Sequence, residues 1–244
     1  RGDIIVDLGR AEAIVPSRER VPSEDYMVGE RIRAYLKDVQ RSSSEPGVIL
    51  SRAAPEFVKA LFCIEVAEIA DGIVEVMGVA RDAGYRTKIA VRTLDEKVDP
   101  IGACVGQRGS RVKNVVRELN GERIDIVRWF EDPRNFAAEA LQPAQVSQSW
   151  VDANNPNVLQ VVVEPDQYSL AIGRRGQNVR LASELIGYQI EITKTEVEAS
   201  FEEQVAEAIA DLAAIDSIGE EYAEALVEKG VLTVDGIMAL SLDE

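Results

Sequence analysis

Val105-Gly106-Gln107-Arg108-Gly109-Ser110-Arg111-Val112 is written a second time in this 244-residue chain, as Ile172-Gly173-Arg174-Arg175-Gly176-Gln177-Asn178-Val179. Each copy has a branched apolar residue, Gly-x-x-Gly with arginine before the second glycine, a polar pair and valine. Each copy also closes on an alternating strand after a glycine, Arg123-Ile124-Asp125-Ile126 and Gln189-Ile190-Glu191-Ile192. Two copies of one supersecondary unit indicate a duplicated module.

The glycine loop lies between two helical patterns in both copies. Apolar residues recur at helical spacing after each loop, at Val112, Val115, Val116 and Leu119 and at Val179, Ala182 and Leu185. A helix that begins at the loop directs its free N–H groups and the positive end of its dipole towards it. Arg108 and Arg175 add positive charge, so the pattern predicts a site for a sugar–phosphate backbone.

A single Gly-x-x-Gly between helices is usually only a tight turn, but two basic copies in register favour a function. The pattern resembles the KH domain, whose GXXG loop clamps about four nucleotides of single-stranded nucleic acid. The RNA-binding residues that we predict in the two copies are Gly106, Gln107, Arg108, Gly109, Ser110, Arg111 and Lys113, and Gly173, Arg174, Arg175, Gly176, Gln177, Asn178 and Arg180.

Composition excludes several other classes of function. The chain has no histidine, which removes histidine-based acid–base catalysis, Ser-His-Asp and Cys-His nucleophiles and most zinc sites. It has no Gly-x-x-x-x-Gly-Lys-Ser/Thr loop for nucleotides. We therefore expect no enzymatic activity, no catalytic residues, no metal and no cofactor. No apolar run approaches the roughly 18 residues of a membrane span, so we expect no membrane contact.

The two cysteines and the first residue bear on the setting of the chain. Cys63 and Cys104 both fall on apolar helical patterns, so we expect two reduced core residues in a cytoplasmic protein. The chain begins at Arg1 without a methionine or a signal-like start. We expect a piece of a longer protein.

The net charge of −16 is not spread evenly. Residues 195–244 contain 14 acidic side chains and one lysine, a net charge of −13, and the remaining 194 residues carry only −3. The candidate RNA-binding part is therefore nearly neutral, and the acidity belongs mostly to the C-terminal segment.

Residues 1–52 have the pattern of short strands separated by turns, which indicates a small barrel. The phrases Asp3-Ile4-Ile5-Val6-Asp7-Leu8-Gly9, Val28-Gly29-Glu30-Arg31-Ile32 and Ile49-Leu50-Ser51-Arg52 resemble the ribosomal S-one type of OB-fold domain. That family has one more strand before the first of these phrases. We predict a partial OB-fold, RNA-binding barrel without its first strand.

Two modules follow the barrel, at residues 53–128 and 129–194. Helical or strand periodicity predicts one helix and two strands ahead of each loop, at 55–70, 73–79 and 87–91 and again at 129–141, 146–151 and 158–163. Each module then has the order α-β-β-α-α-β, which resembles the type II KH fold. The predicted fold class is α+β multidomain, with two tandem type II KH domains.

Residues 195–244 have an acidic and helical pattern. Val205, Ile209 and Leu212 form one apolar face, and Tyr222, Ala223, Leu226 and Val227 form another. The stretch Ile215-Asp216-Ser217-Ile218-Gly219-Glu220-Glu221-Tyr222-Ala223 resembles a helix-hairpin-helix element. Acidic residues stand where that family has basic ones, which favours contact with protein over contact with phosphate.

The order of barrel, two KH modules and acidic helices resembles the NusA family of bacterial transcription elongation factors. The phrases that carry this resemblance are Asp99-Pro100-Ile101-Gly102-Ala103-Cys104-Val105-Gly106, Gly121-Glu122-Arg123-Ile124-Asp125-Ile126-Val127 and Leu170-Ala171-Ile172-Gly173-Arg174-Arg175-Gly176-Gln177-Asn178-Val179-Arg180-Leu181. The resemblance implies that the chain binds nascent single-stranded RNA, RNA polymerase and other elongation or antitermination factors, and modulates pausing, termination and antitermination. Two alternatives stay open, an accessory region of an exoribonuclease and a ribosome-associated KH protein.

Overall fold

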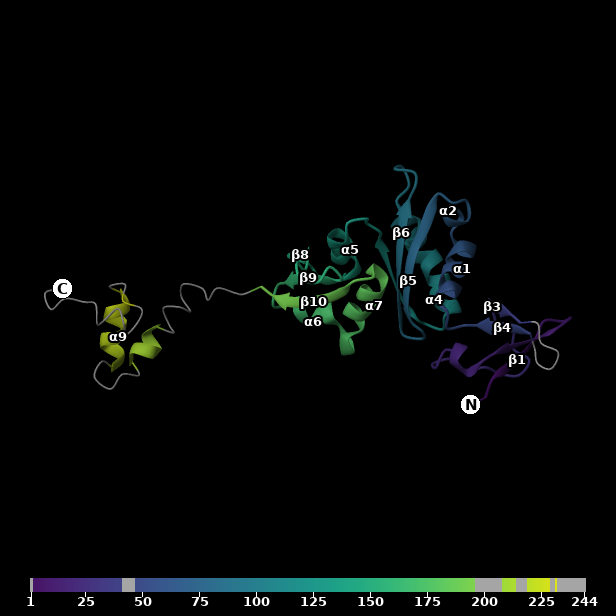
Figure 1. Cartoon of the computed structure of the whole chain (residues 1–244), viewed down its shortest axis with the longest axis horizontal. Coiled ribbons are helices and arrows are strands. Elements are labelled where there is room, and N and C mark those ends of the chain that lie inside the picture. Colours follow the sequence, from purple (N-terminus) through teal and green to yellow (C-terminus); the bar gives the residue numbers. More distant parts are fainter. Residues whose placement is uncertain (1, 41–46, 196–207, 214–218, 229–230, 232–244) are drawn as a thin grey trace. The chain divides into compact units, whose positions relative to one another are not determined.

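The computed structural model describes residues 2–40, 47–195, 208–213, 219–228 and 231. The chain divides into two units, Arg1–Lys194 and Thr195–Glu244, and both glycine loops belong to the first (Figure 1). None of the helices in the described ranges combines the length and apolar character that a membrane span requires.

Four short strands form the N-terminal sheet, in the order β1-β2-β4-β3. They are β1 (Ile4–Asp7), β2 (Glu12–Val15), β3 (Tyr35–Val39) and β4 (Val48–Ser51). The central pair β2 and β4 is parallel, and the two outer pairs are antiparallel. Ala13, Val15 and Leu50 form a small buried core. Each outer strand, β1 and β3, pairs along one edge only among the described residues.

The first module follows the predicted order of elements. Its elements are α1 (Pro55–Glu65), α2 (Ala67–Ala70), β5 (Val74–Asp82), β6 (Arg86–Thr93), α3 (Pro100–Val105), α4 (Ser110–Glu118) and β7 (Arg123–Arg128). The sheet has the order β5-β6-β7, with β5 antiparallel and β7 parallel to β6. Helices α1 and α4 pack together against this sheet (Figure 1). The single helix predicted at 55–70 is two helices, because Val66 is extended, with φ −118° and ψ 104°.

The second module repeats the arrangement. Its elements are α5 (Pro133–Ala140), β8 (Gln148–Val151), β9 (Val158–Val163), α6 (Tyr168–Ile172), α7 (Gln177–Ile186) and β10 (Gln189–Lys194). The sheet has the order β10-β9-β8, with β10 parallel to β9. Helix α5 begins four residues later than the predicted start at 129. Asp132 caps the helix through the Arg134 amide and Pro133 occupies its first turn, a sequence that favours a helix start there.

Apolar packing joins the two modules. Ala90 and Val127 of the first sheet form one buried cluster with Phe136 of α5, and the partly buried residues around it are Trp129, Phe130, Leu185 and Ile186. Helix α7 also lies close to β5, where a Cβ added to Gly78 would stand 3.2 Å from the Leu185 side chain. The second module therefore packs directly against the sheet of the first.

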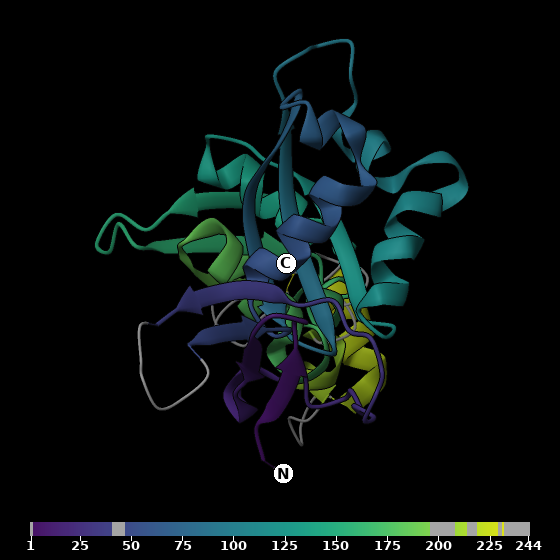
Figure 2. The same cartoon turned by 90° about the vertical axis from the view of Figure 1, so that its right-hand side faces the viewer.

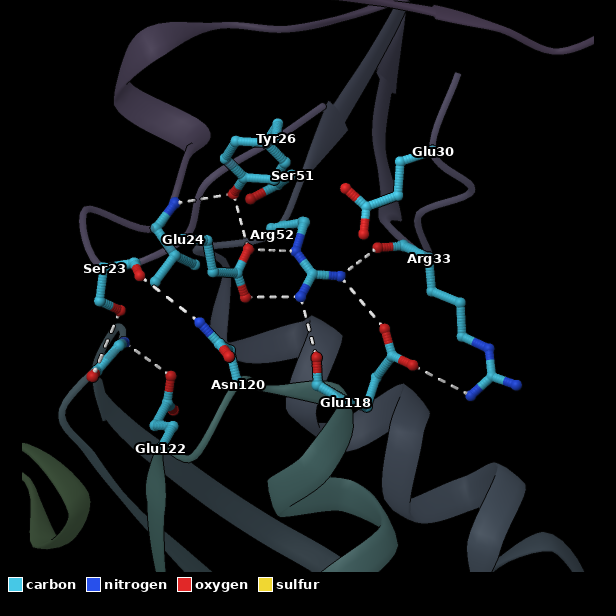
Figure 3. A network of polar contacts seen from close by, with 12 residues as sticks. Ser23, Glu24, Tyr26, Glu30, Arg33, Ser51, Arg52, Glu118, Asn120 and Glu122 are labelled. Atoms are coloured by element: carbon cyan, nitrogen blue, oxygen red, sulfur yellow. Dashed lines mark hydrogen bonds and ion pairs between the residues drawn. The ribbon is translucent and has the colours of Figure 1, made fainter. Parts of the chain in front are cut away.

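The N-terminal sheet, drawn in purple to dark blue in Figure 2, is joined to the first module by a charged network (Figure 3). The Arg52 guanidinium, which is 5% exposed, donates two hydrogen bonds to the Glu24 carboxylate. It also donates to the Glu118 carboxylate at 3.2 Å, the Glu118 carbonyl at 2.9 Å and the Arg33 carbonyl at 2.6 Å. One arginine at the end of β4 thus connects the N-terminal sheet with the last turn of α4.

A second arginine, Arg81 of β5, lies next to this network. Its side chain and that of Glu122 are both 0% exposed and form a bidentate pair with two distances of 2.9 Å. Arg81 also donates to the Arg52 and Ala54 carbonyls. Glu122 in turn accepts from the Gly84 amide and from a threonine hydroxyl. Because every charged group is hydrogen-bonded, burial of this pair is tolerated.

The structure corrects the expectation for one cysteine. Cys104 is buried, and burial raises the pKa of its thiol to about 12. Cys63 is exposed, although it lies in α1. The buried face of α1 is formed by Phe57, Val58, Leu61 and Phe62, and Cys63 is one residue past this face.

The C-terminal unit contains two described helical segments, residues 208–213 and α9 (Gly219–Glu228). Ala208, Leu212, Ala223 and Val227 form its buried cluster. Tyr222, expected on the apolar face, is 69% exposed because it lies on the opposite side of α9 from Val227. Val205 and the first four residues of the helix-hairpin-helix-like stretch, 215–218, lie outside the described residues.

We predict that Glu122→Ala lowers the free energy of unfolding by about 3–5 kcal/mol, because it leaves the Arg81 charge buried without its partner. The matched control is Glu75→Ala, which breaks the half-exposed pair with Arg92 between β5 and β6 and costs at most about 1 kcal/mol. Urea denaturation followed by circular dichroism measures both. Equal losses of unfolding free energy in the two variants would show that the buried pair contributes no more to stability than the half-exposed pair.

Candidate nucleic-acid interface

Both glycine loops adopt the same backbone. In the first, Gly106 has φ 73° and ψ 173°, Arg108 has φ 54° and Gly109 has φ 74°. The second loop matches these angles within a few degrees, with φ 73° at Gly173, 54° at Arg175 and 71° at Gly176. The sequence repeat is therefore a structural repeat at the level of single dihedral angles.

Two separate constraints require a glycine at the first position of each loop. Its positive φ lies where side chains with a Cβ are strained. In addition, a Cβ on Gly106 would stand 2.7 Å from the Arg111 Cγ, and a Cβ on Gly173 would stand 2.7 Å from the Asn178 Cβ. The second glycine is different, because a Cβ on Gly109 would meet nothing closer than 3.5 Å and one on Gly176 would meet nothing within 4 Å. The second glycine therefore leaves open space where a ligand backbone can approach.

The third residue of each loop, Arg108 or Arg175, is a non-glycine residue with positive φ. Such a conformation costs of order 1–3 kcal/mol and persists only where the surroundings impose it. Both arginine side chains are exposed, as are those of Gln107 and Arg174 beside them. Strained backbone, exposed cations and open space thus occur together in both loops.

The helix after each loop adds to the positive field. Helix α4 starts at Ser110 and α7 at Gln177, directly after the second glycine, and no side chain caps either start among the described residues. The first amide of each helix, at Ser110 or Gln177, donates to a carbonyl of its own loop, at Gln107 or Arg174. The helix dipole nevertheless favours the negative charge of a phosphate at this end.

Two of the predicted RNA-binding residues support the loops from within. Asn178 is fully buried, and its amide donates to the Leu141 carbonyl at 2.9 Å and the Ala171 carbonyl at 3.1 Å. This burial removes Asn178 from the surface, which corrects the prediction. Arg111, 67 residues earlier, is half-buried and donates to the Ala103 carbonyl at 2.6 Å and to Glu68 at 2.8 Å. Both residues tie the helix after the loop to the helix before it.

The other predicted residues remain on the surface or at its margin. Ser110, Lys113 and Arg180 are exposed, and Gln177 is half-buried. The Lys113 ammonium donates to the Arg108 carbonyl at 3.0 Å, across its own loop. Gln177 and Arg180 instead donate to the first module, to the carboxylate of Asp82 at the end of β5.

This contact lies at a groove with a volume of about 1300 Å³, which both modules line. The second module contributes its loop, with Arg174, Arg175 and Arg180. The first contributes residues that the sequence analysis missed, namely Asp82, Tyr85, Arg86 and Arg123. The groove thus contains five arginines. The basic turn from Arg81 to Arg86 was visible in the sequence, but nothing there showed that it would face the second loop.

In the described part of the chain, no group of three or more histidine, cysteine, aspartate or glutamate side chains is arranged to hold a metal ion. The described groove offers five arginines, which suit a polyanion.

The two modules, each with the order α-β-β-α-α-β and a glycine loop before its last helix, define a chain with tandem KH domains. Models of a NusA-like first KH domain and a NusA-like second KH domain match residues 52–129 and 133–200. The chain belongs to the NusA family.

Curated relatives are identical to this chain at about half of the aligned positions. Transcription termination/antitermination protein NusA of Halalkalibacterium halodurans is 50% identical over 197 residues, which are 80% of this chain and 51% of that protein. The protein of the same name from Bacillus subtilis is 49% identical, over 80% of this chain and 52% of its own length. That from Thermus thermophilus is 46% identical, over 81% and 51%. The chain therefore spans about half the length of these relatives.

We predict that Arg108→Asp combined with Arg175→Asp weakens binding of a single-stranded RNA at least about tenfold at low salt, because each loop then presents a negative charge to phosphates. Aspartate tolerates the left-handed region, so the backbone strain does not increase. Fluorescence anisotropy with a labelled RNA measures the affinity.

The control is Lys59→Asp, which makes the same change in charge as one of the two loop substitutions, on the exposed side of α1. It should leave the affinity within about twofold, and all variants should keep the thermal unfolding midpoint of the parent chain. An unchanged affinity in the loop variant would contradict the assignment of the loops, and a lost unfolding transition would make the effect structural.

Proposed function

We propose that this chain holds nascent single-stranded RNA on its two KH modules and thereby modulates pausing, termination and antitermination by RNA polymerase. The observation that carries the proposal is the coincidence of two identical strained glycine loops, each followed by an uncapped helix start, with one arginine-lined groove. Such a surface binds a phosphate backbone without reading a duplex.

The proposed contacts to RNA follow from what is exposed. The backbone at Gly106, Gly109, Gly173 and Gly176 lies against the sugar–phosphate chain in this proposal, while the four amides keep their hydrogen bonds within the chain. The side chains that we assign to phosphate or sugar contacts are Gln107, Arg108, Ser110, Lys113, Arg174, Arg175, Gln177 and Arg180. Arg111 acts by supporting the first loop.

The bases lie along apolar side chains in this proposal. Neither loop contains an aromatic residue, so base stacking of the kind seen on aromatic sheets is not expected. Partly buried aliphatic residues flank both loops, Val112 beside the first and Val179 beside the second. Sequence preference should therefore be modest and come from polar and backbone contacts.

We further propose that residues 1–52 are part of an OB-fold of the ribosomal S-one type that extends the RNA surface. In support, β1 and β3 each have one unpaired edge among the described residues, and a strand between them would close the sheet into a barrel. The first KH domain then spans residues 53–128 and the second 129–194.

The proposed partners besides RNA are RNA polymerase and other elongation or antitermination factors, in the cytoplasm. The names of the curated relatives support this over an exoribonuclease or ribosomal setting. Residues 195–244, proposed as a helix-hairpin-helix-like acidic repeat, carry a net charge of −13 that repels RNA and attracts basic protein surfaces.

A single-round transcription assay with bacterial RNA polymerase tests the proposal. Adding the chain should change the lifetime of a hairpin-dependent pause, and the Arg108→Asp/Arg175→Asp variant should leave the lifetime as it is without the chain. The Lys59→Asp variant should act like the parent. An equal change by parent and loop variant would show that RNA held at the loops is not how the chain acts, and no change by the parent would contradict the proposed function itself.

A further inference from the structure

Asp82 of the first module makes the polar contact at the start of the second module's loop helix. Its Oδ2 accepts hydrogen bonds from the Gln177 Nε2 and the Arg180 Nη2, each at 2.8 Å. The Asp82 side chain is 31% exposed and the Arg180 side chain 60% exposed. A carboxylate therefore stands, accessible to solvent, where the two donors face the groove.

Asp82 is also the only carboxylate among the described residues that line the groove. Arg86 is partly neutralised by Asp125, a residue that does not line the groove, at a distance of 2.7 Å. Arg174 and Arg175 form no ion pair with any residue in the described ranges. Of the three groove arginines that belong to the second module, only Arg180 is thus paired with an anion.

The first loop shows that this arrangement is not a requirement of the fold. The residues equivalent to Gln177 and Arg180, 67 positions earlier, are Ser110 and Lys113. Lys113 donates to a carbonyl of its own loop, and no carboxylate in the described part of the chain pairs with it. The same loop backbone therefore forms without an aspartate opposite its helix.

Nor does the packing of the modules depend on Asp82. The apolar cluster of Ala90, Val127 and Phe136 joins them, and α7 packs along β5. A half-exposed ion pair at the margin of such an interface contributes little to stability. The Asp82 carboxylate therefore affects the charge of the groove more than the packing of the two modules.

We propose that Asp82 occupies the place of one RNA phosphate at the start of α7, so that RNA must displace it to use Gln177 and Arg180. The inference rests on the proposed RNA binding and deepens it, because Asp82 sets the affinity of the second module. The second loop has Arg174 where the first has Gln107, and the aspartate offsets this extra positive charge. An exposed ion pair is weak enough to exchange for a phosphate contact.

Asp82→Asn tests the proposal. It should tighten binding of a single-stranded RNA about two- to fivefold at low salt. It should also steepen the dependence of log affinity on log salt concentration by about 0.7, the value for one more phosphate contact on a single strand. The control Glu75→Gln removes one negative charge from an exposed pair on the same strand and should leave the salt slope unchanged.

The tightening should also depend on Arg180, so Asp82→Asn should gain much less affinity in an Arg180→Ala background. Unchanged or weaker binding by Asp82→Asn, or an equal gain with and without Arg180, would overturn the proposal. These outcomes differ from failure of the proposed function, in which the parent chain itself would bind RNA no better than the Arg108→Asp/Arg175→Asp variant.

Discussion

The left-handed backbone of the two glycine loops is the constraint on which the rest of the candidate site depends. It brings each loop helix against the helix before it so closely that Gly106 and Gly173 have no room for a side chain. Arg111 and Asn178 then fix this approach by donating to carbonyls of the preceding helix. The result is a pair of preformed surfaces, each of which combines exposed arginines with the positive end of a helix, and preformed surfaces lower the cost of binding.

The packing around the loops converts two small sites into one surface. The apolar cluster around Phe136 seats the second module on the sheet of the first, and the second loop consequently faces the turn after Asp82. On the other side, the charges of Arg52 and Arg81 hold the N-terminal sheet to the first module. Polar contacts thus position the N-terminal sheet, while apolar contacts join the KH modules.

Much of this could be predicted from the sequence, because the repeat of glycines, valines and closing strands is a local signal. The order of elements and the exposed loop arginines follow from it. Whether a side chain is buried depends on distant neighbours and does not follow from the local pattern. Asn178 lies in a polar pattern yet is buried and donates to the Leu141 carbonyl, and Cys63 lies in an apolar pattern yet is exposed. Likewise, only the packing of the two modules brings Asp82 and Arg123 to the second loop, so no spacing in the sequence could have placed them in the site.

The central claim is that both loops hold the backbone of one single strand, and the affinity for RNA as a function of its length tests it most directly. One KH loop accommodates about four nucleotides. The affinity of the chain for single strands of four to sixteen nucleotides should therefore rise in two stages, with a second gain of at least about 10²-fold once the strand reaches both loops. That second gain should vanish when either loop arginine alone is replaced by aspartate. An affinity that increases smoothly with length, and to the same extent in the single-loop variants, would contradict the claim.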